Sequence, residues 1–499
     1  MNTYGGSMSS ELKKKYGLMT AICLVVGTVI GSGVFFKAQD VLKLTGGNMV
    51  TGILAWAITG LVMLACILAF AIISTKYEKV NGVVDYAEAL VGPRYGYFIG
   101  WFMSVIYYPA MTSTLAWVSA RYFVVFMKNV NPNFGFYSVV NPDGADFSAL
   151  AGPETMTWAL VFLVGVFAMN ALAPKIAGYF QVSATFIKMV PIAMVMIGGV
   201  IYGLVAGDGM LVENFTAVSD AVKSDVTGNP LFAAIIATAF AYEGWIVATS
   251  INAELNNAKR NLPIALICGG VIIVLVYILY FVGVAGGAST ETLRAQGATV
   301  AFTNIYGKTL GLCLDAFVVI SCLGTLNGLM LAGTRSIYAM SSRGRGPQAE
   351  TFSQVDKKTN MPANSAIFFV FVTAVWLMYF YFANMSYNAS SWVGVFAFDS
   401  SELPIVTMYP LYIPIFIMFM KRSKGEGFIK RFVIPFFAIC ASIFMGAATI
   451  YSHGIQRYMD DKTCPVFYYL IVFAVIMVIG MFFVRAKNVM HPNQKKKKH

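Results

Sequence analysis

About twelve apolar runs, separated by short polar segments, follow one another along the chain, and each is near the length of about 20 residues that crosses a bilayer as a helix. The predicted spans are residues 17–36, 49–73, 96–127, 155–173, 177–205, 230–252, 263–286, 309–340, 364–384, 392–420, 430–451 and 464–484. The pattern predicts an all-α polytopic membrane protein with about 12 transmembrane helices.

Two of these runs are interrupted near their middle. The first contains GTVIGSG, residues 27–33, although each interior glycine destabilises a helix by roughly 1 kcal/mol relative to alanine. The sixth contains FAYEGW, residues 240–245, in which a carboxylate costs a few kcal/mol or more at membrane depth. Irregular backbone is tolerated inside a membrane only where it lines a cavity or is buried in protein. Both runs are therefore predicted to be broken helices.

The positions of the two breaks predict a binding site. Broken spans at equivalent places in two halves of opposite orientation are the pattern of inverted repeats with a site at the midplane. A broken helix exposes N–H groups that attract an anion and carbonyls that attract a cation, and an α-amino acid carries one group of each sign. We expect the carboxylate to bind the N–H groups of Gly31, Ser32 and Gly33. We expect the ammonium to bind carbonyls of residues 28–30 and 240–241.

The composition agrees with a membrane protein, because 58% of the residues are hydrophobic, only 12% are charged and the mean hydropathy is +0.70. The net charge of +12 falls in short basic clusters between apolar runs, which is typical of loops beside an anionic leaflet and not of a nucleic-acid surface. We expect a multi-pass protein of the cell membrane with both termini cytoplasmic and no nucleic-acid partner. The seven cysteines show no paired spacing, so we expect no disulfide framework, metal site or cofactor.

Four stretches carry a resemblance to a known family: GTVIGSGVF in the first span, FAYEGW in the sixth, AELNNAKRNLPIAL after it, and SCLGTLNGLMLAGTRSIYAMSSRGRGP in the eighth. Together they resemble the amino acid–polyamine–organocation superfamily, and within it the L-amino-acid transporters and bacterial serine/threonine exchangers. The resemblance covers nearly the whole chain. It implies the leucine-transporter type fold of five plus five inverted spans and two peripheral spans. It also implies amino acid exchange or proton-coupled uptake by alternating access.

On this fold the chain divides into a cytoplasmic N-terminal tail, a first five-helix repeat, a second and inverted five-helix repeat, two peripheral helices and a basic C-terminal tail. The expected boundaries are residues 1–16, 17–205, 206–420, 421–485 and 486–499.

Lys188 lies in the fifth span, about 13 residues or roughly 20 Å of helical rise beyond Lys175. Its ammonium is therefore out of easy reach of either membrane surface, which favours a functional role over a snorkelling lysine. In the family, a lysine at the matching place resembles a substitute for a bound sodium ion and bridges the first and eighth spans. Ser321 is the candidate partner on the eighth span. The resemblance implies sodium-independent transport.

The resemblance also implies roles for residues beside the breaks. Phe240 is expected either to fold over the substrate as a gate or to pack. Only one of Tyr107 and Tyr108 is expected to face the pocket, because adjacent helical residues point about 100° apart, and Tyr108 is the candidate. Thr325 lines the pocket or forms an interhelical hydrogen bond worth about 1 kcal/mol. The substrate-binding candidates are thus Thr28, Val29, Ile30, Gly31, Ser32, Gly33, Tyr108, Phe240, Ala241, Tyr242, Glu243, Gly244, Trp245 and Thr325, and the gating or coupling candidates are Phe240, Lys188, Ser321 and Glu243.

The charge of Glu243 must be matched, because an unpaired buried carboxylate becomes neutral. Three matches are open: a cationic substrate side chain, a proton, or a fixed set of hydrogen bonds that includes Tyr108 or Thr325. We favour small neutral L-amino acids as substrates, with Glu243 protonated or hydrogen-bonded. The alternative is transport of cationic amino acids or polyamines, with Glu243 as the counter-charge. Asp399 and Glu402, near the outer part of the tenth span, are either rim charges or residues of a cation path.

Functions of other classes are disfavoured. An intramembrane enzyme needs a nucleophile or a metal set, and the spans contain no HExxH, no histidine and no recognisable paired-aspartate motif. A channel would be indicated by a repeated filter sequence and not by two broken helices. The expected partners are an amino acid and the lipid bilayer, with proton coupling left open. The sequence carries no signal for an oligomeric state or an accessory subunit.

Overall fold

The computed structural model describes residues 14, 16–31, 33–76, 82–131, 134, 153–216, 229–385, 398 and 400–484. Ser32, Asp399 and the predicted C-terminal tail lie outside the described residues. Within the described ranges the regular elements are helices, and one isolated β-bridge joins Tyr16 to Leu255. The all-α prediction is confirmed.

The elements, in chain order, are α1 (Leu18–Val29), α2 (Gly33–Leu44), α3 (Met49–Ser74), α4 (Gly82–Leu90), α5 (Pro93–Phe102), η1 (Met103–Tyr107), α6 (Tyr108–Val130), α8 (Pro153–Leu172), α9 (Pro174–Ala193), η2 (Met194–Gly198), α10 (Gly199–Val205), α11 (Leu211–Thr216), α12 (Pro230–Tyr242), η3 (Trp245–Glu254), α13 (Ala258–Gly287), α14 (Thr290–Gln296), α15 (Ala298–Tyr306), α16 (Lys308–Ser341), α17 (Ala349–Phe352), α18 (Ala363–Met385), α20 (Pro404–Arg422), η4 (Ile429–Val433), α21 (Ile434–Ile450), η5 (Tyr451–Gln456), α22 (Arg457–Asp461) and α23 (Pro465–Met481).

Nine helices in the described part of the chain are long and apolar enough to cross a membrane, and α1 with α2 makes a tenth if the bent pair counts as one span. The two other predicted runs, 96–127 and 464–484, lie on the continuous helical stretch α5–η1–α6 and on α23. Most predicted spans therefore coincide with a helix. The run predicted at 392–420 is helical from Pro404 onward in its described part.

Capping residues set several helix starts. The side chain of Asn229 accepts a hydrogen bond from the N–H of Leu231 at 3.0 Å, and Pro230 occupies the first helical position of α12. Asn48 caps α3 in the same way, through the N–H of Thr51 at 2.9 Å. These residues satisfy N–H groups that a helix start would otherwise leave without a partner.

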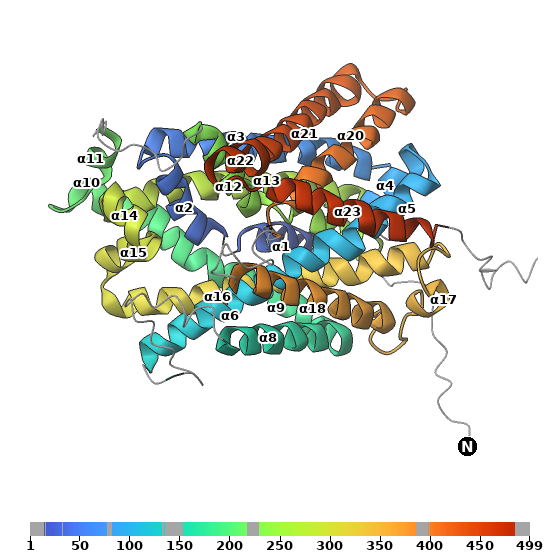
Figure 1. Cartoon of the computed structure of the whole chain (residues 1–499), viewed down its shortest axis with the longest axis horizontal. Helices are drawn as coiled ribbons and strands as arrows, with labels where there is room; N and C mark the ends of the chain where they lie inside the picture. Colours follow the sequence, from blue (N-terminus) through green and yellow to red (C-terminus); the bar gives the residue numbers. More distant parts are fainter. Residues whose placement is uncertain are drawn as a thin grey trace, which may run out of the picture.

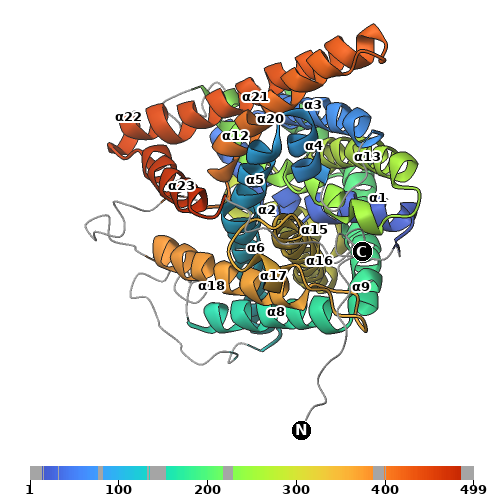
Figure 2. The same ribbon diagram turned by 90° about the vertical axis from the view of Figure 1, so that its right-hand side faces the viewer.

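The helices form a bundle with the broken first span near its centre (Figure 1). In both views α8 and α18 lie along one side of the bundle, and α20 and α21 lie along the opposite side (Figure 2). Between these sides α1 packs against α9, α13, α16 and η3, while α2 packs against α12. The two breaks predicted from the sequence are thus surrounded by helices and not by lipid.

Candidate functional site

The first span breaks between α1 and α2. Helix α1 ends at Val29, and Ile30 adopts an extended conformation with φ −72° and ψ 90°. Helix α2 begins at Gly33, and its axis is bent by 45° from that of α1. The break falls within the glycine-rich stretch in which it was predicted, where the helix is weakest.

The second break lies between α12 and η3. Helix α12 ends at Tyr242, Glu243 is extended, and Gly244 has φ +106°, in the left-handed region that glycine adopts without the steric penalty of a side chain. The chain then continues from Trp245 to Glu254 as a 3₁₀ helix of 10 residues. Runs of 3₁₀ helix longer than about four residues are uncommon and often mark a hinge.

The two breaks lie directly against each other. The hydroxyl of Thr28 is 3.0 Å from the carbonyl oxygen of Gly244. A Cβ atom built on Gly33 would lie 2.9 Å from the Cα atom of Ala241, so only glycine fits there without a shift of the backbone. The two halves of the predicted site therefore meet at residues that are far apart in sequence.

Tyr277 of α13 joins the two breaks from a third helix. Its hydroxyl oxygen lies 2.8 Å from the carbonyl oxygen of Val29 and 2.7 Å from that of Ala241, the last turns of α1 and α12. A hydroxyl carries a single proton, so it donates to one of these carbonyls at a time. Each carbonyl keeps acceptor capacity for a second donor, as a bound ammonium would require.

The Lys188 side chain is fully buried and its ammonium is surrounded by carbonyl oxygens. The Nζ atom lies 2.7 Å from the oxygen of Gly27 and 2.5 Å from that of Ile30, both at the end of α1. It also lies 3.2 Å from the carbonyl oxygen of Ser321 on α16. The contact to Ser321 is made by the backbone, and the Ser321 hydroxyl has no hydrogen-bond partner among the described residues.

The Glu243 side chain is buried and points toward aromatic residues of other spans. Its Oε2 atom accepts a hydrogen bond from the hydroxyl of Tyr107 at 2.7 Å. Its Oε1 atom has no hydrogen-bond partner among the residues that the structure describes. The donors expected from the sequence, Tyr108 and Thr325, do not hold this carboxylate. Tyr108 packs against the ring of Tyr107 with 5.2 Å between centroids.

The other predicted site residues divide between the breaks and the packing around them. Thr325 donates to the Gly27 carbonyl at 3.1 Å, and its hydroxyl would be 2.8 Å from a Cβ atom on Gly31. The Tyr242 hydroxyl donates to the Trp56 carbonyl at 2.9 Å, on the side of α12 that faces α3. Trp245 packs against Phe70 and Tyr412. Tyr242 and Trp245 thus lie in packed aromatic surroundings.

Ion pairs lie on both sides of the breaks. We call the side of Arg335 and of the start of α1 the inner side, since the N-terminus is predicted to be cytoplasmic, and we call the side of Lys37 the outer side. On the inner side, the fully buried Arg335 pairs with the fully buried Glu254 at the end of η3. The N–H of Tyr16, just before α1, donates to the Glu254 carbonyl at 3.0 Å. These contacts tie the start of α1 to η3 and α16.

On the outer side, Lys37 of α2 lies 2.6 Å from a carboxylate oxygen of Glu402, just before α20. His453 of η5 lies 3.0 Å from the other oxygen of the same carboxylate. The Lys37 Nζ atom is also 5.7 Å from the centroid of the Phe240 ring. Lys37, Glu402 and His453, together with Asp40, help to line a cavity of about 380 Å³.

Sequence reasoning missed Tyr277 and Gln181 as neighbours of the breaks. Tyr277 is a hydroxyl-bearing residue within an apolar run, which is a weak signal because tyrosines are common in membrane helices. Of the adjacent pair Tyr107 and Tyr108, the sequence favours Tyr108, whereas the structure places Tyr107 against Glu243.

Comparison with known proteins identifies the family. The sequence model of the family described as amino acid permease matches residues 16–482. The chain belongs to this family. The permease is 29% identical over 471 residues to the serine/threonine exchanger SteT of Bacillus subtilis, which covers 92% of the permease and 97% of the relative. It is 27% identical over 425 residues to the mouse b(0,+)-type amino acid transporter 1, covering 82% of the permease and 81% of the relative. It is 26% identical over 365 residues to the human cystine/glutamate transporter, covering 72% of the permease and 67% of the relative.

The family and these relatives establish the class of function. The permease is a multi-pass membrane protein that transports amino acids, and it is not an enzyme. One of these relatives is named an exchanger, which supports amino acid exchange. The relatives are named for different substrates, so the substrate class has to be inferred from the site.

Proposed function

We propose that this permease is a sodium-independent exchanger of small neutral L-amino acids that works by alternating access in the cell membrane, with both termini cytoplasmic. The observation that carries the proposal is the position of Lys188. Its ammonium has three N–H donors, and three carbonyl oxygens from Gly27, Ile30 and Ser321 surround it. Carbonyl oxygens at helix ends are also what a bound sodium ion would require, so the lysine supplies the positive charge in its place.

The substrate site lies where the two breaks meet. The start of α2 at Gly33 offers N–H groups to the substrate carboxylate, as helix N-termini commonly do for anions. The ends of α1 and α12 offer the carbonyls of Val29 and Ala241 to the ammonium, beside the Tyr277 hydroxyl. In this proposal residues 17–205 and 206–420 are the two inverted repeats, and each contributes one broken span.

The side chain of the substrate points toward Glu243. Because Oε1 of this buried carboxyl has no partner among the described residues, a donor from the substrate would satisfy it. A serine or threonine hydroxyl supplies such a donor, and the exchanger SteT is named for these two amino acids. The free Oε1 atom also favours a second candidate function, the transport of cationic amino acids. A cationic side chain would bring both a hydrogen-bond donor and a charge opposite to that of Glu243.

The proposal is tested with purified protein in liposomes. Labelled serine or threonine outside should exchange for unlabelled amino acid inside at the same rate in sodium and in choline buffers. Collapse of exchange in choline would contradict the role of Lys188. If an imposed pH gradient drives uptake into vesicles that contain no amino acid, the permease works by proton-coupled uptake and not by exchange. Faster exchange of lysine or ornithine than of serine would favour the second candidate.

A further inference from the structure

Three buried side-chain amides form a row on the inner side of the first break, which we call the amide row. The Nδ2 atom of Asn170 on α8 donates to Oδ1 of Asn327 on α16 at 2.7 Å. The Nδ2 atom of Asn327 donates to Oε1 of Gln181 on α9 at 2.8 Å. All three side chains belong to residues that are at most 3% exposed. The row therefore crosses three helices as one continuous polar strip.

Two backbone carbonyls determine which way the amides face. Asn170 Nδ2 also donates to the carbonyl of Val166 at 2.9 Å, and Asn327 Nδ2 also donates to the carbonyl of Ala177 at 3.2 Å. A carbonyl oxygen requires an N–H group, so neither asparagine amide can be turned over without two oxygens meeting. Gln181 must consequently present its oxygen to Asn327. Its Nε2 atom is the free end of the row and has no partner in the described part of the chain.

The free donor lies next to the first break. A Cβ atom built on Gly27 would lie 2.7 Å from Gln181 Nε2, so this amide touches α1 close to the end of the helix. The opposite end of the row is Asn170, close to the end of α8 at Leu172. Its Oδ1 atom is also without a partner among the described residues. The row thus leads from the breaks toward the inner helix ends. Its free donor, Gln181 Nε2, lies beside the first break, and its free acceptor, Asn170 Oδ1, lies at the far end.

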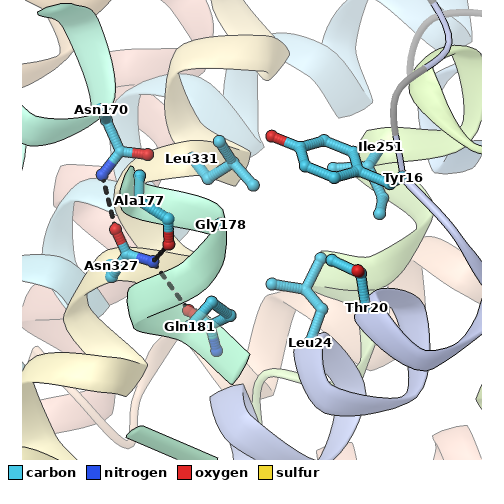
Figure 3. Close-up of a pocket in the computed structure, with 10 residues that line it drawn as sticks. All are labelled: Tyr16, Thr20, Leu24, Asn170, Ala177, Gly178, Gln181, Ile251, Asn327 and Leu331. Atoms are coloured by element: carbon cyan, nitrogen blue, oxygen red, sulfur yellow. Dashed lines mark hydrogen bonds between the residues drawn. The ribbon is translucent and has the colours of Figure 1, made fainter. Parts of the chain in front are cut away.

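The row borders a small cavity on the inner side (Figure 3). The amides lie along one wall, and Tyr16, Thr20 and Leu24 lie on the facing wall (Figure 3). The cavity has a volume of about 10 Å³, enough for a water molecule but not for an amino acid. A substrate reaches the amides only when the inner half of α1 moves away from α9 and α16.

We propose that the amide row is a second amino acid subsite on the route of release to the inner side, where Gln181 Nε2 donates to the substrate carboxylate after it leaves the first break. This inference rests on the alternating-access exchange proposed above. A buried N–H group without a partner costs about 1–3 kcal/mol, and a carboxylate restores the missing hydrogen bond. A neutral amide binds a carboxylate more weakly than a lysine or arginine does, which suits a site that the substrate must leave. Asn170 Oδ1 offers an acceptor to the ammonium farther along.

The test compares the two faces of the same protein. Exchange is measured in liposomes with the permease in one orientation, and KM is determined separately for substrate on the outer and the inner side. Gln181→Met removes the donor at similar volume, while Gln181→Glu keeps the oxygen that accepts from Asn327 and puts a second carboxylate oxygen, which repels the substrate carboxylate, in place of the free donor. Gln181→Met should raise the inner KM about ten-fold, the effect of one lost hydrogen bond to a charged group, and Gln181→Glu should raise it at least as much, while both leave the outer KM unchanged.

Three results separate the possibilities. An unchanged inner KM, or equal changes on both faces, overturns the subsite. If the parent protein itself shows no exchange, the proposed function is overturned instead. Asn304→Leu is the matched control, because this amide donates to the Gly287 carbonyl at 2.9 Å, away from the breaks, and it should move neither KM.

A Thr20→Cys variant tests the route with the row intact. Thr20 faces the amides across the cavity. Saturating substrate on the inner side should slow its reaction with a small thiol reagent added on that side, relative to the labelling of the parent chain. Equal labelling rates with and without substrate would contradict passage along the row.

Discussion

The Nζ atom of Lys188 lies 2.5 Å from the carbonyl oxygen of Ile30, the first residue beyond the end of α1. The broken end of the first span is therefore held by a charge that the protein carries itself. Because the same ammonium contacts α16 through Ser321, it links the first span to a neighbouring helix. In the alternating-access exchange proposed above, we expect this charge to influence which conformations of the first span are stable.

Lys188→Ala is expected to slow exchange by at least about ten-fold, since it removes the ammonium that the carbonyls of Gly27, Ile30 and Ser321 surround. The variant should still insert into the membrane, because its helix loses no backbone hydrogen bond. Initial rates of exchange are compared at equal amounts of inserted protein. A variant that exchanges at the parental rate would show that the link between α1 and α16 is unnecessary.

Gly33→Val is expected to abolish substrate binding while the protein still inserts. A Cβ atom at this position would meet the Cα atom of Ala241 at 2.9 Å, and backbone cannot give way as a flexible side chain can. Binding is measured by the shift in melting temperature on addition of substrate. Gly165→Val is the control, because a Cβ atom there meets nothing within 4 Å and the residue is exposed on α8. Substrate binding by Gly33→Val with parental affinity would place the site elsewhere.

Tyr277→Phe is expected to reduce exchange about three- to ten-fold, the effect of one neutral hydrogen bond of roughly 1 kcal/mol. The hydroxyl lies between the carbonyls of Val29 and Ala241, and its removal takes away one of the contacts that hold the two breaks together. Tyr280→Phe is a close control on the same helix, because the Tyr280 hydroxyl is buried and has no partner among the described residues. Equal activity of the two variants would show that the bridge contributes nothing.

Glu243→Gln distinguishes a neutral substrate, a cationic substrate and a transported proton at the buried carboxyl. A hydroxyl-bearing neutral substrate should be retained with KM changed by less than about ten-fold, because the amide still offers an oxygen to the donor. A cationic substrate should be lost selectively, because its counter-charge is gone. A transported proton at this site would make exchange by the variant insensitive to pH. Uptake of serine, threonine, leucine, lysine and ornithine is measured at several pH values for both proteins.

Arg335→Met is expected to lower the stability of the folded protein by about 3–5 kcal/mol, because it leaves a buried carboxylate without its partner. Combining it with Glu254→Gln should restore much of the loss, since the second change removes the stranded charge. Thermal unfolding in detergent gives the midpoints of the four proteins. A single variant as stable as the parent would mean that the pair at the inner side is dispensable.

Both breaks could be predicted because they violate the rules of an ordinary membrane helix. Glycines in GTVIGSG weaken the first span, and a carboxylate in the sixth is costly in lipid, so each break can be recognised in one short stretch of sequence. Lys188 can be recognised in the same way, because a lysine is also costly inside a membrane span. These signals are local, and the structure places all three stretches at one point of the bundle.

The partners of these residues could not be predicted, because they depend on helices far away in the chain. The choice between Tyr107 and Tyr108 assumed α-helical geometry, whereas residues Met103–Tyr107 form a π-helical turn. A π turn inserts an extra residue and changes which side chain faces a neighbour. The amide row shows the same limit, since its members lie on three spans and each amide alone resembles a packing residue.

Because η3 is a 3₁₀ helix, the sixth span is longer than it would be if the same residues formed an α-helix. A 3₁₀ helix rises about 2.0 Å per residue and an α-helix about 1.5 Å, so the ten residues of η3 would shorten by about 5 Å if they rewound as an α-helix. Because Tyr16 is paired with the end of η3, such a contraction would pull the start of α1 with it. The two broken spans are thus joined at their inner ends, and one change of helical pitch would move both.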